Sequence, residues 1–220
     1  NLFRKYKPPS FDLIHILETK EELKKYGWRN ENIASLMFRD NAYLKNFGLY
    51  ANSNKLDFSY HDYRDSDINC YEELIEHVSK ENFVARIGHS SHKSLKQGSK
   101  RVDFTKVKKK AYLDYIIPTL SEFIISTGTG IDTIGYVFNI PLMHVNAVPV
   151  SFIQSSCNLY YLPKKLFYLD NGKELTLRDY ITSCYLRTDE FFKNGIGFHS
   201  RSGSELIEYF EEFKKLFLFK

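Results

Sequence analysis

Short runs of apolar residues alternate along the chain with longer segments in which apolar residues recur every three or four positions. The short runs predict buried strands, and the periodic segments predict amphipathic helices. Strands are predicted at residues 33–38, 83–88, 122–126, 141–145 and 196–199. Because strands that alternate with helices join into parallel sheets, the pattern predicts an α/β fold with one Rossmann-like, doubly wound and mostly parallel sheet.

The helix over residues 68–80 is the best marked, since its apolar residues follow helical spacing and Asp67 is a suitable N-cap. Further helices are predicted over residues 21–27, 131–138, 176–184 and 202–217. The polar stretches 41–64 and 89–110 show little periodicity, so both are predicted to be loops.

No internal repeat and no linker rich in glycine or proline divides the chain, so we expect one folded domain. Residues 33–220 carry all of the predicted strands and make up this domain. We expect residues 1–32 to be a lead-in, either the tail of a preceding domain or a linker.

Composition narrows the class of protein. Of the 220 residues, 43% are hydrophobic and 26% charged, which excludes a disordered or collagen-like chain. The 31 basic and 27 acidic residues leave a net charge of only +4, so nucleic acid is not an expected partner. Cys70, Cys157 and Cys184 lie far apart and predict no disulfide framework. With no apolar run of about 20 residues, these features favour a cytoplasmic protein.

A buried strand runs into a glycine-rich turn that opens a short helix, within residues 123–138. Such a turn gathers backbone N–H groups and the positive end of a helix dipole, which suits a phosphate. The candidate residues are Ser126, Thr127, Gly128, Thr129 and Gly130. Two interpretations stay open, a phosphate cradle or a turn in which glycine only permits tight packing. The spacing matches neither the G-x-G-x-x-G motif nor the P-loop.

Polar residues at the ends of other predicted strands point to the same edge of the sheet. Arg39 follows the first strand, Arg86 lies near the end of the second, and His144 and Asn146 close the strand after the glycine turn. A guanidinium suits a diphosphate because it donates two parallel hydrogen bonds, but a structural ion pair explains either arginine equally well.

The segment before the helix at 68–80 supplies two more candidates, Arg64 and Asp65. Asp65 and Asp132 are the weak candidates for a catalytic base, although a carboxylate at the start of the helix repels phosphate unless it points away. The histidines of this region lack the spacing of a structural zinc site, and no metal is expected.

Three motifs follow one another in order: H-x-x-R-D at residues 61–65, R-x-G at 86–88 and F-x-I-x-T-x-x-G at 123–130. In this order they resemble a family of bacterial glycosyltransferases that build surface polysaccharides. The resemblance extends over nearly the whole chain, from Ile33 to Phe213. It implies a GT-B-like fold, of which this chain corresponds to the carboxyl-terminal, nucleotide-sugar-binding half.

The resemblance also implies roles for the candidate residues. The turn from Ser126 to Gly130 would hold the diphosphate, Arg39 and Arg86 would neutralise the leaving group, and Glu205 would meet a ribose or serve as a first-turn acid of the last helix. The reaction would need no cofactor or bound metal. The implied partners are a nucleotide sugar and a glycan or lipid-linked acceptor.

The basic stretch from Lys93 to Lys110 is expected to be either a solvated loop or a contact with an anionic membrane surface, at its inner face. Two other functions stay open: an enzyme like the sugar-nucleotide epimerases, and a nucleotide-binding remnant without activity. The sequence predicts neither the sugar nor the acceptor, the stereochemical outcome or the oligomeric state.

Overall fold

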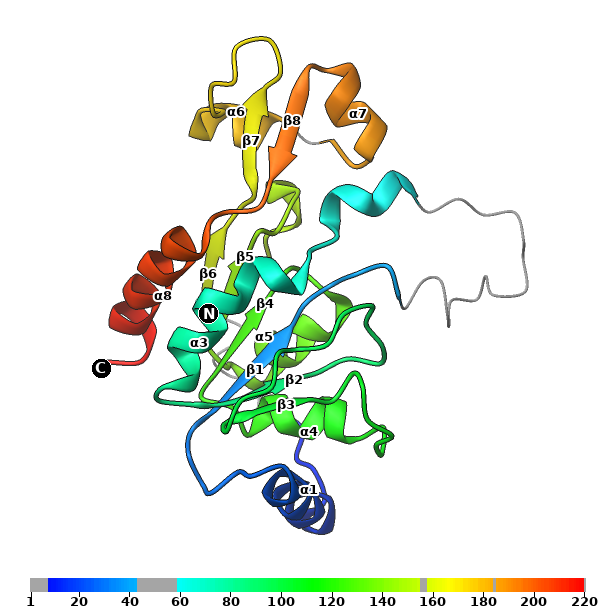
Figure 1. Ribbon diagram of the computed structural model, residues 1–220, viewed down its shortest axis with the longest axis vertical. Helices are drawn as coiled ribbons and strands as arrows, with labels where there is room; N and C mark the ends of the chain where they lie inside the picture. The colour runs from blue at the N-terminus through cyan, green and yellow to red at the C-terminus, as the bar shows by residue number, and fades with distance from the viewer. Residues whose placement is uncertain (1–7, 43–58, 155–157, 184, 220) are drawn as a thin grey trace, which may run out of the picture.

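A computed structural model describes residues 8–42, 59–154, 158–183 and 185–219 (Figure 1). At its centre is a six-stranded sheet in the order β3-β2-β1-β4-β5-β6, and every pair of neighbouring strands is parallel. The strands are β1 (Ile33–Met37), β2 (Phe83–Arg86), β3 (Arg101–Asp103), β4 (Phe123–Ser126), β5 (Leu142–Val145) and β6 (Leu159–Leu162). This order is that of the Rossmann fold, and the direction of winding reverses between β1 and β4.

Helices cover both faces of the sheet, which confirms the doubly wound α/β fold. On one face, α3 (Glu72–Ser79) and α8 (Gly203–Phe217) pack on strand residues such as Leu36 and Ile125. On the other face lie α1 (Leu13–Lys25), α4 (Leu113–Thr119) and α5 (Thr133–Phe138). Leu23 of α1 is fully buried in this second core, so the helix of the lead-in is packed onto the domain.

The predicted strands and helices agree with the structure wherever an apolar run is continuous. Asp67 caps the short 3-10 helix η3 (Ile68–Tyr71), which leads into α3, and Gly27 follows α1 with a positive φ of 94°. The prediction of a loop over 89–110 is wrong at β3, and the sequence pattern also missed α4, β6, β7 and α7. β3 is a three-residue edge strand in which Val102 alone is buried, so its pattern is too short to detect.

The other predicted loop, 41–64, ends in a 3-10 helix, η2 (Ser59–Arg64), while its residues 43–58 lie outside the described part of the chain. Cys157 and Cys184 lie outside it as well, and Cys70 is a free, exposed thiol.

A small second layer, here called the cap, stands beyond the carboxyl ends of β5 and β6 (Figure 1). It consists of the antiparallel pair β7 (Lys165–Tyr168) and β8 (Ile196–His199) with α6 (Leu177–Thr182), α7 (Thr188–Lys193) and η2. Tyr63, Leu166 and Phe191 form part of its own apolar core. Lys164, between β6 and β7, binds the end of η2 and the residue that follows it, because its Nζ donates to Tyr63 O and Asp65 O at 2.7 Å each.

Candidate functional site

Two cavities open at the carboxyl edge of the sheet, on either side of the turn that follows β4. The Arg64 cavity, of about 470 Å³, is walled by residues that include Arg64, Tyr136, His144, Phe152 and Tyr161. The Arg39 cavity, of about 570 Å³, is walled by residues that include Phe38, Arg39, Asp40, Gly88 and Tyr115. Thr129, Gly130 and Thr133 belong to both walls. Parallel α/β sheets bind ligands at this edge, near the reversal of strand order.

The hydroxyl groups of the turn are hydrogen-bonded within the chain. Ser126 Oγ lies 2.6 Å from Asp132 Oδ1 and accepts from Gly128 N at 3.1 Å. Thr129 donates from both N and Oγ1 to the Asp132 carboxylate, each at 2.7 Å. Thr127 Oγ1 accepts from Arg39 N at 2.8 Å. The hydroxyls of Ser126 and Thr129 are therefore engaged with the carboxylate of Asp132, and the role of the turn as a phosphate cradle stays a prediction.

Gly128 and Gly130 have different surroundings. Gly128 has a φ of 81°, which an L side chain rarely adopts, and its carbonyl faces Arg64. A Cβ added at Gly130 would meet no heavy atom within 4 Å, so the turn is open at this residue. The open part of the turn is the wall that the two cavities share.

Arg64 is a half-buried cation at the wall of its cavity. Its Nη2 donates to Gly128 O at 3.0 Å, and its guanidinium lies 5.5 Å from the ring centre of Phe152. Burial lowers the pKa of Arg64, and the charge of Arg39 lowers it further. Within the described part of the chain, Arg64 forms no ion pair with a carboxylate. The charges of Asp132 and Asp65 oppose the lowering of its pKa in part, so within the described residues Arg64 is compensated at a distance and not by a paired carboxylate.

Arg39 is compensated in part. Its Nε donates to Asp65 Oδ1 at 3.1 Å. Burial raises the pKa of Asp65 although Arg39 opposes the change. Around the nearby His61, burial and then the charges of Arg39, Arg64 and Arg187 lower the pKa of the imidazole. The space between η2 and the turn is therefore positive, with Asp65 engaged as a counter-ion.

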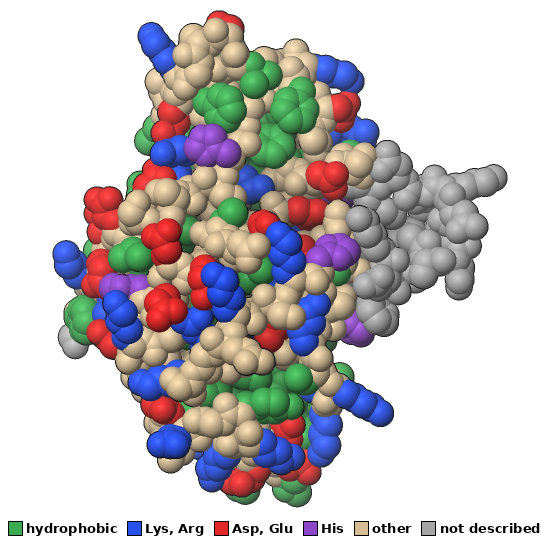
Figure 2. All heavy atoms as spheres, in the orientation of Figure 1, with side chains coloured by type: hydrophobic (Ala, Val, Ile, Leu, Met, Phe, Trp, Pro, Cys, Tyr) green, Lys and Arg blue, Asp and Glu red, His purple; other side chains and the backbone are tan. Residues whose placement is uncertain are grey.

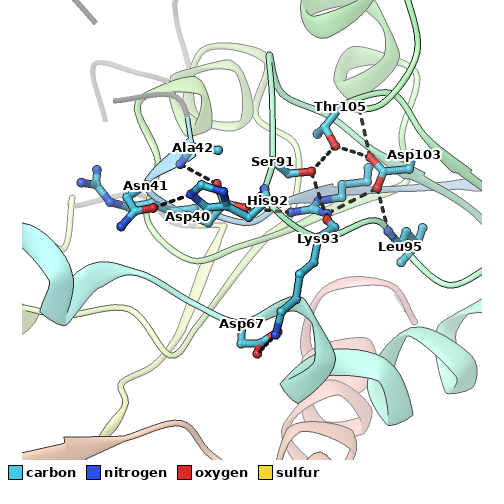
Figure 3. Close-up of polar contacts among 12 residues, drawn as sticks. Asp40, Asn41, Ala42, Asp67, Ser91, His92, Lys93, Leu95, Asp103 and Thr105 are labelled. Atoms are coloured by element: carbon cyan, nitrogen blue, oxygen red, sulfur yellow. Dashed lines mark hydrogen bonds and ion pairs between the residues drawn. The ribbon is translucent and has the colours of Figure 1, made fainter. Parts of the chain in front are cut away.

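Arg86 lies away from both cavities. Its side chain is only 2% exposed, Nη1 donates to Lys93 O at 2.7 Å, and the guanidinium lies 3.4 Å from Asp103 Oδ2 and 3.8 Å from Asp40 Oδ2. Figure 3 shows how Asp40 and Asp103 also accept hydrogen bonds from the loop after β2, from His92 N and Leu95 N. A charge inside an apolar strand is thus held by two carboxylates of its own chain, and the expected contact of Arg86 with a leaving group stays a prediction.

Asn146 and Glu205 also act within the chain. Asn146 is fully buried, accepts from Arg201 N at 2.7 Å and donates to Tyr71 Oη at 3.0 Å. Glu205 closes the capping box of α8 with Ser202 and pairs with Lys165 at 2.6 Å. Burial alone would raise the pKa of Glu205, but the hydrogen bonds from Lys165 and Ser202 lower it to about 2. Neither side chain lines either cavity.

The aromatic residues of the Arg64 cavity are those that sequence reasoning missed. Burial and then the charge of Asp132 raise the pKa of Tyr136 to about 12. Burial also raises the pKa of Tyr161, whose Oη donates to Ala147 O at 2.7 Å. No signal marked Tyr161 in the sequence because β6, which carries it, was not predicted.

The basic stretch is largely paired. Lys93 is bonded to Asp67, Lys109 to Asp114 at 2.5 Å and Lys110 to Glu18 at 2.8 Å. Figure 2 shows basic and acidic side chains intermingled over the middle of the face it draws. None of the helices that the structure describes is both long and apolar enough to cross a membrane. The described residues also bring together no group of three or more His, Cys, Asp and Glu side chains that could hold a metal ion.

Comparison of the chain with protein-family models, with curated proteins and with solved structures finds no match.

Proposed function

We propose that the chain is a glycosyltransferase that takes its sugar from a nucleoside diphosphate sugar, and that the Arg64 cavity receives the diphosphate. The glycan or lipid-linked acceptor is the part of this proposal that rests on the resemblance of the three motifs alone.

The observation that carries the proposal is the half-buried charge of Arg64, with which no carboxylate of the described residues is directly paired. Burial of such a cation is unfavourable, and a bound anion offsets the cost. The guanidinium already donates one hydrogen bond to Gly128 O, and it has further N–H groups for the oxygens of a diphosphate.

The shape of the cavity supports the same ligand class. Its volume of about 470 Å³ falls within the range of small-molecule sites. Tyr136, Phe152 and Tyr161 line it, and aromatic faces suit a nucleobase or the apolar face of a sugar. The cavity opens at the carboxyl ends of β4 and β5, the edge at which parallel α/β sheets bind ligands, next to the reversal of strand order between β1 and β4.

In the reaction, the bond between the anomeric carbon and the diphosphate breaks and the diphosphate leaves with the electron pair. Donors fixed at that oxygen stabilise the charge, and each is worth about 3 kcal/mol at the transition state. Arg64 has this role here, and Arg39, half neutralised by Asp65, adds a weaker positive field.

Calorimetric titration of the full chain with UDP, GDP, uridine and guanosine tests the proposal. We expect one diphosphate to bind at least about 10-fold more tightly than its nucleoside, because charge-assisted hydrogen bonds are lost with the phosphates. Equal affinity for nucleoside and diphosphate, or no binding of either, would refute a diphosphate site.

Product analysis with the matching nucleotide sugar, with and without a glycan acceptor, separates the three functions left open. Transfer to the glycan supports the proposal, whereas a changed sugar still attached to the nucleotide indicates an epimerase. Binding without any turnover indicates a remnant.

A further inference from the structure

A histidine and a buried carboxylate meet at the wall of the Arg64 cavity. His144 is on β5, opposite Ser126 of β4 in the sheet register, and is 5% exposed. Its Nε2 lies 3.0 Å from Asp132 Oδ2. Nε2 itself is buried and has no hydrogen-bond partner among the described residues, so its approach to Asp132 is a close contact of opposite charges, and His144 is one of the residues that wall the cavity.

The carboxylate of Asp132 is held in place from several sides. Oδ1 accepts from Ser126 Oγ and Thr129 Oγ1, and Oδ2 accepts from Thr129 N. The imidazole is held as well, because Tyr136 and Tyr161 pack edge-on against it with ring centres 6.4 Å and 5.8 Å away. Both groups are therefore preorganised without a ligand.

A carboxylate beside one imidazole nitrogen decides which nitrogen carries the proton. The negative charge of Asp132, 3.0 Å from Nε2, favours a proton on that nitrogen, and Nδ1 of the neutral imidazole then keeps its lone pair. The same carboxylate stabilises the imidazolium that forms when Nδ1 takes up a proton.

We propose that His144 is the general base of the transfer reaction and that Asp132 is the residue that positions it. This assignment rests on the proposed function. The attacking oxygen, from water or from an acceptor hydroxyl, forms a bond to the anomeric carbon and gives its proton to Nδ1. The bond to the diphosphate breaks, and the electron pair leaves with the diphosphate beside Arg64.

The other carboxylates of the site are unsuited to the task. Asp65 is paired with Arg39, and the oxygens of Asp132 are occupied by donors of the turn. The charged and titratable groups that face His144 are Asp132, Tyr136, Tyr161 and Arg64. Burial raises the pKa of both tyrosines, so neither titrates near neutral pH.

The test uses the full chain and two measurements, titration with UDP or GDP and release of that diphosphate from its nucleotide sugar with water or a glycan as acceptor. We expect His144→Gln to lower kcat at least about 100-fold while the Kd for the diphosphate changes less than about threefold. His77→Gln is the matched control, because His77 is paired with Glu211 on the outside of α3 and should change neither quantity.

The split between kcat and Kd in a second variant separates a positioning carboxylate from a structural one. We expect Asp132→Asn to lower kcat while the Kd for the diphosphate changes less than about threefold, since the imidazole loses the group that positions it. The nitrogen NMR signals of His144 provide a second measurement in the unaltered protein, where we expect the proton on Nε2.

Each outcome decides the assignment. A His144→Gln variant that binds the diphosphate and keeps kcat within threefold overturns the base alone, as does a neutral imidazole with its proton on Nδ1. Absence of diphosphate binding, or binding without release in the unaltered protein, overturns both the base and the proposed function.

Discussion

Arg86 and Arg64 are two arginines near the carboxyl edge of one sheet, and their surroundings differ in counter-charge. Arg86 lies among Asp40, Asp103 and Lys93 O, and its guanidinium is almost fully buried. Among the described residues, Arg64 has one carbonyl and one aromatic ring as direct partners, and it lies at the wall of a cavity. The first arginine is part of the fold, and the second has donors to spare for a ligand.

The comparison shows that position at a strand end does not decide whether an arginine is available. Availability depends on whether the neighbouring strands bring carboxylates to it. β3 brings Asp103 to Arg86, whereas the segment beside Arg64 gives its carboxylate, Asp65, to Arg39 instead. Substitutions at these cations therefore separate fold from function.

Arg86→Met gives the largest expected effect. Removal of the cation leaves the largely buried carboxylates of Asp40 and Asp103 without their counter-ion, and we expect a loss of about 3–5 kcal/mol in the free energy of unfolding. Urea denaturation measures it. Lys93→Met is the control, because Lys93 is exposed and its pair with Asp67 should contribute less than about 1 kcal/mol. Equal effects of the two substitutions would contradict the structural role of Arg86.

Arg64→Met is expected to weaken ligand binding more than stability, the opposite of Arg86→Met. We expect the affinity for the nucleoside diphosphate to fall about 10- to 100-fold, because charge-assisted hydrogen bonds contribute about 1.5–3 kcal/mol. The free energy of unfolding should change by less than about 1 kcal/mol, since no carboxylate in the described ranges is paired with Arg64. Titration calorimetry and urea denaturation measure the two effects.

Arg64→Lys sharpens this test. Lysine keeps the positive charge but cannot donate two parallel hydrogen bonds as a guanidinium does. An affinity for the diphosphate between those of the unaltered protein and Arg64→Met therefore indicates bidentate binding by Arg64. A loss of stability without a loss of affinity in Arg64→Met would show that Arg64, like Arg86, has a structural role.

The same distinction explains what sequence reasoning could and could not predict. The buried strands and the glycine turn were predictable because continuous apolar runs and glycine carry local signals. The role of Arg86 was not, since it depends on Asp103, in an edge strand of three residues. The hydrogen bonds of the turn hydroxyls were not predictable either, because they depend on Asp132, at the start of the following helix, which accepts from Ser126 and Thr129. The Arg64 cavity was not predictable because Tyr161, which lines it, lies on β6, a strand that the sequence pattern did not predict.

Lys164 is an intermediate case, a buried cation held by two carbonyls. Burial lowers its pKa to about 8, although the charge of Asp65 opposes the change. The unfolded chain, with a lysine pKa of about 10.4, binds more protons above pH 8, so stability rises with pH in this window. We expect Lys164 to add about 2 kcal/mol to the free energy of unfolding between about pH 7 and about pH 9.5.

The measurement for Lys164 is urea denaturation at several pH values, compared with Lys164→Met. The variant should lack this rise, while groups that titrate in both proteins, such as Lys109, cancel in the difference. A parallel pH dependence of the two proteins would show that Lys164 keeps an ordinary pKa in the folded state.

Glu205 extends the comparison of paired and available side chains to an anionic residue. Its substitution is expected to have the smallest effect of those considered. It pairs with Lys165 and caps α8 through Ser202, and these hydrogen bonds hold its pKa near 2 despite burial. A carboxylate whose folded pKa is lowered stabilises the fold above its unfolded pKa, and this contribution is lost as the pH falls from about 4.3 toward 2. We expect Glu205→Gln to lower the free energy of unfolding by about 0.5–1 kcal/mol at neutral pH, as for a lost cap, and the difference to shrink as the solution is acidified.

Diphosphate affinity should not change in Glu205→Gln, because Glu205 lines neither cavity. A variant that keeps its stability but loses affinity would restore Glu205 to the binding site and show that counter-charge within the chain does not exclude a residue from ligand contact.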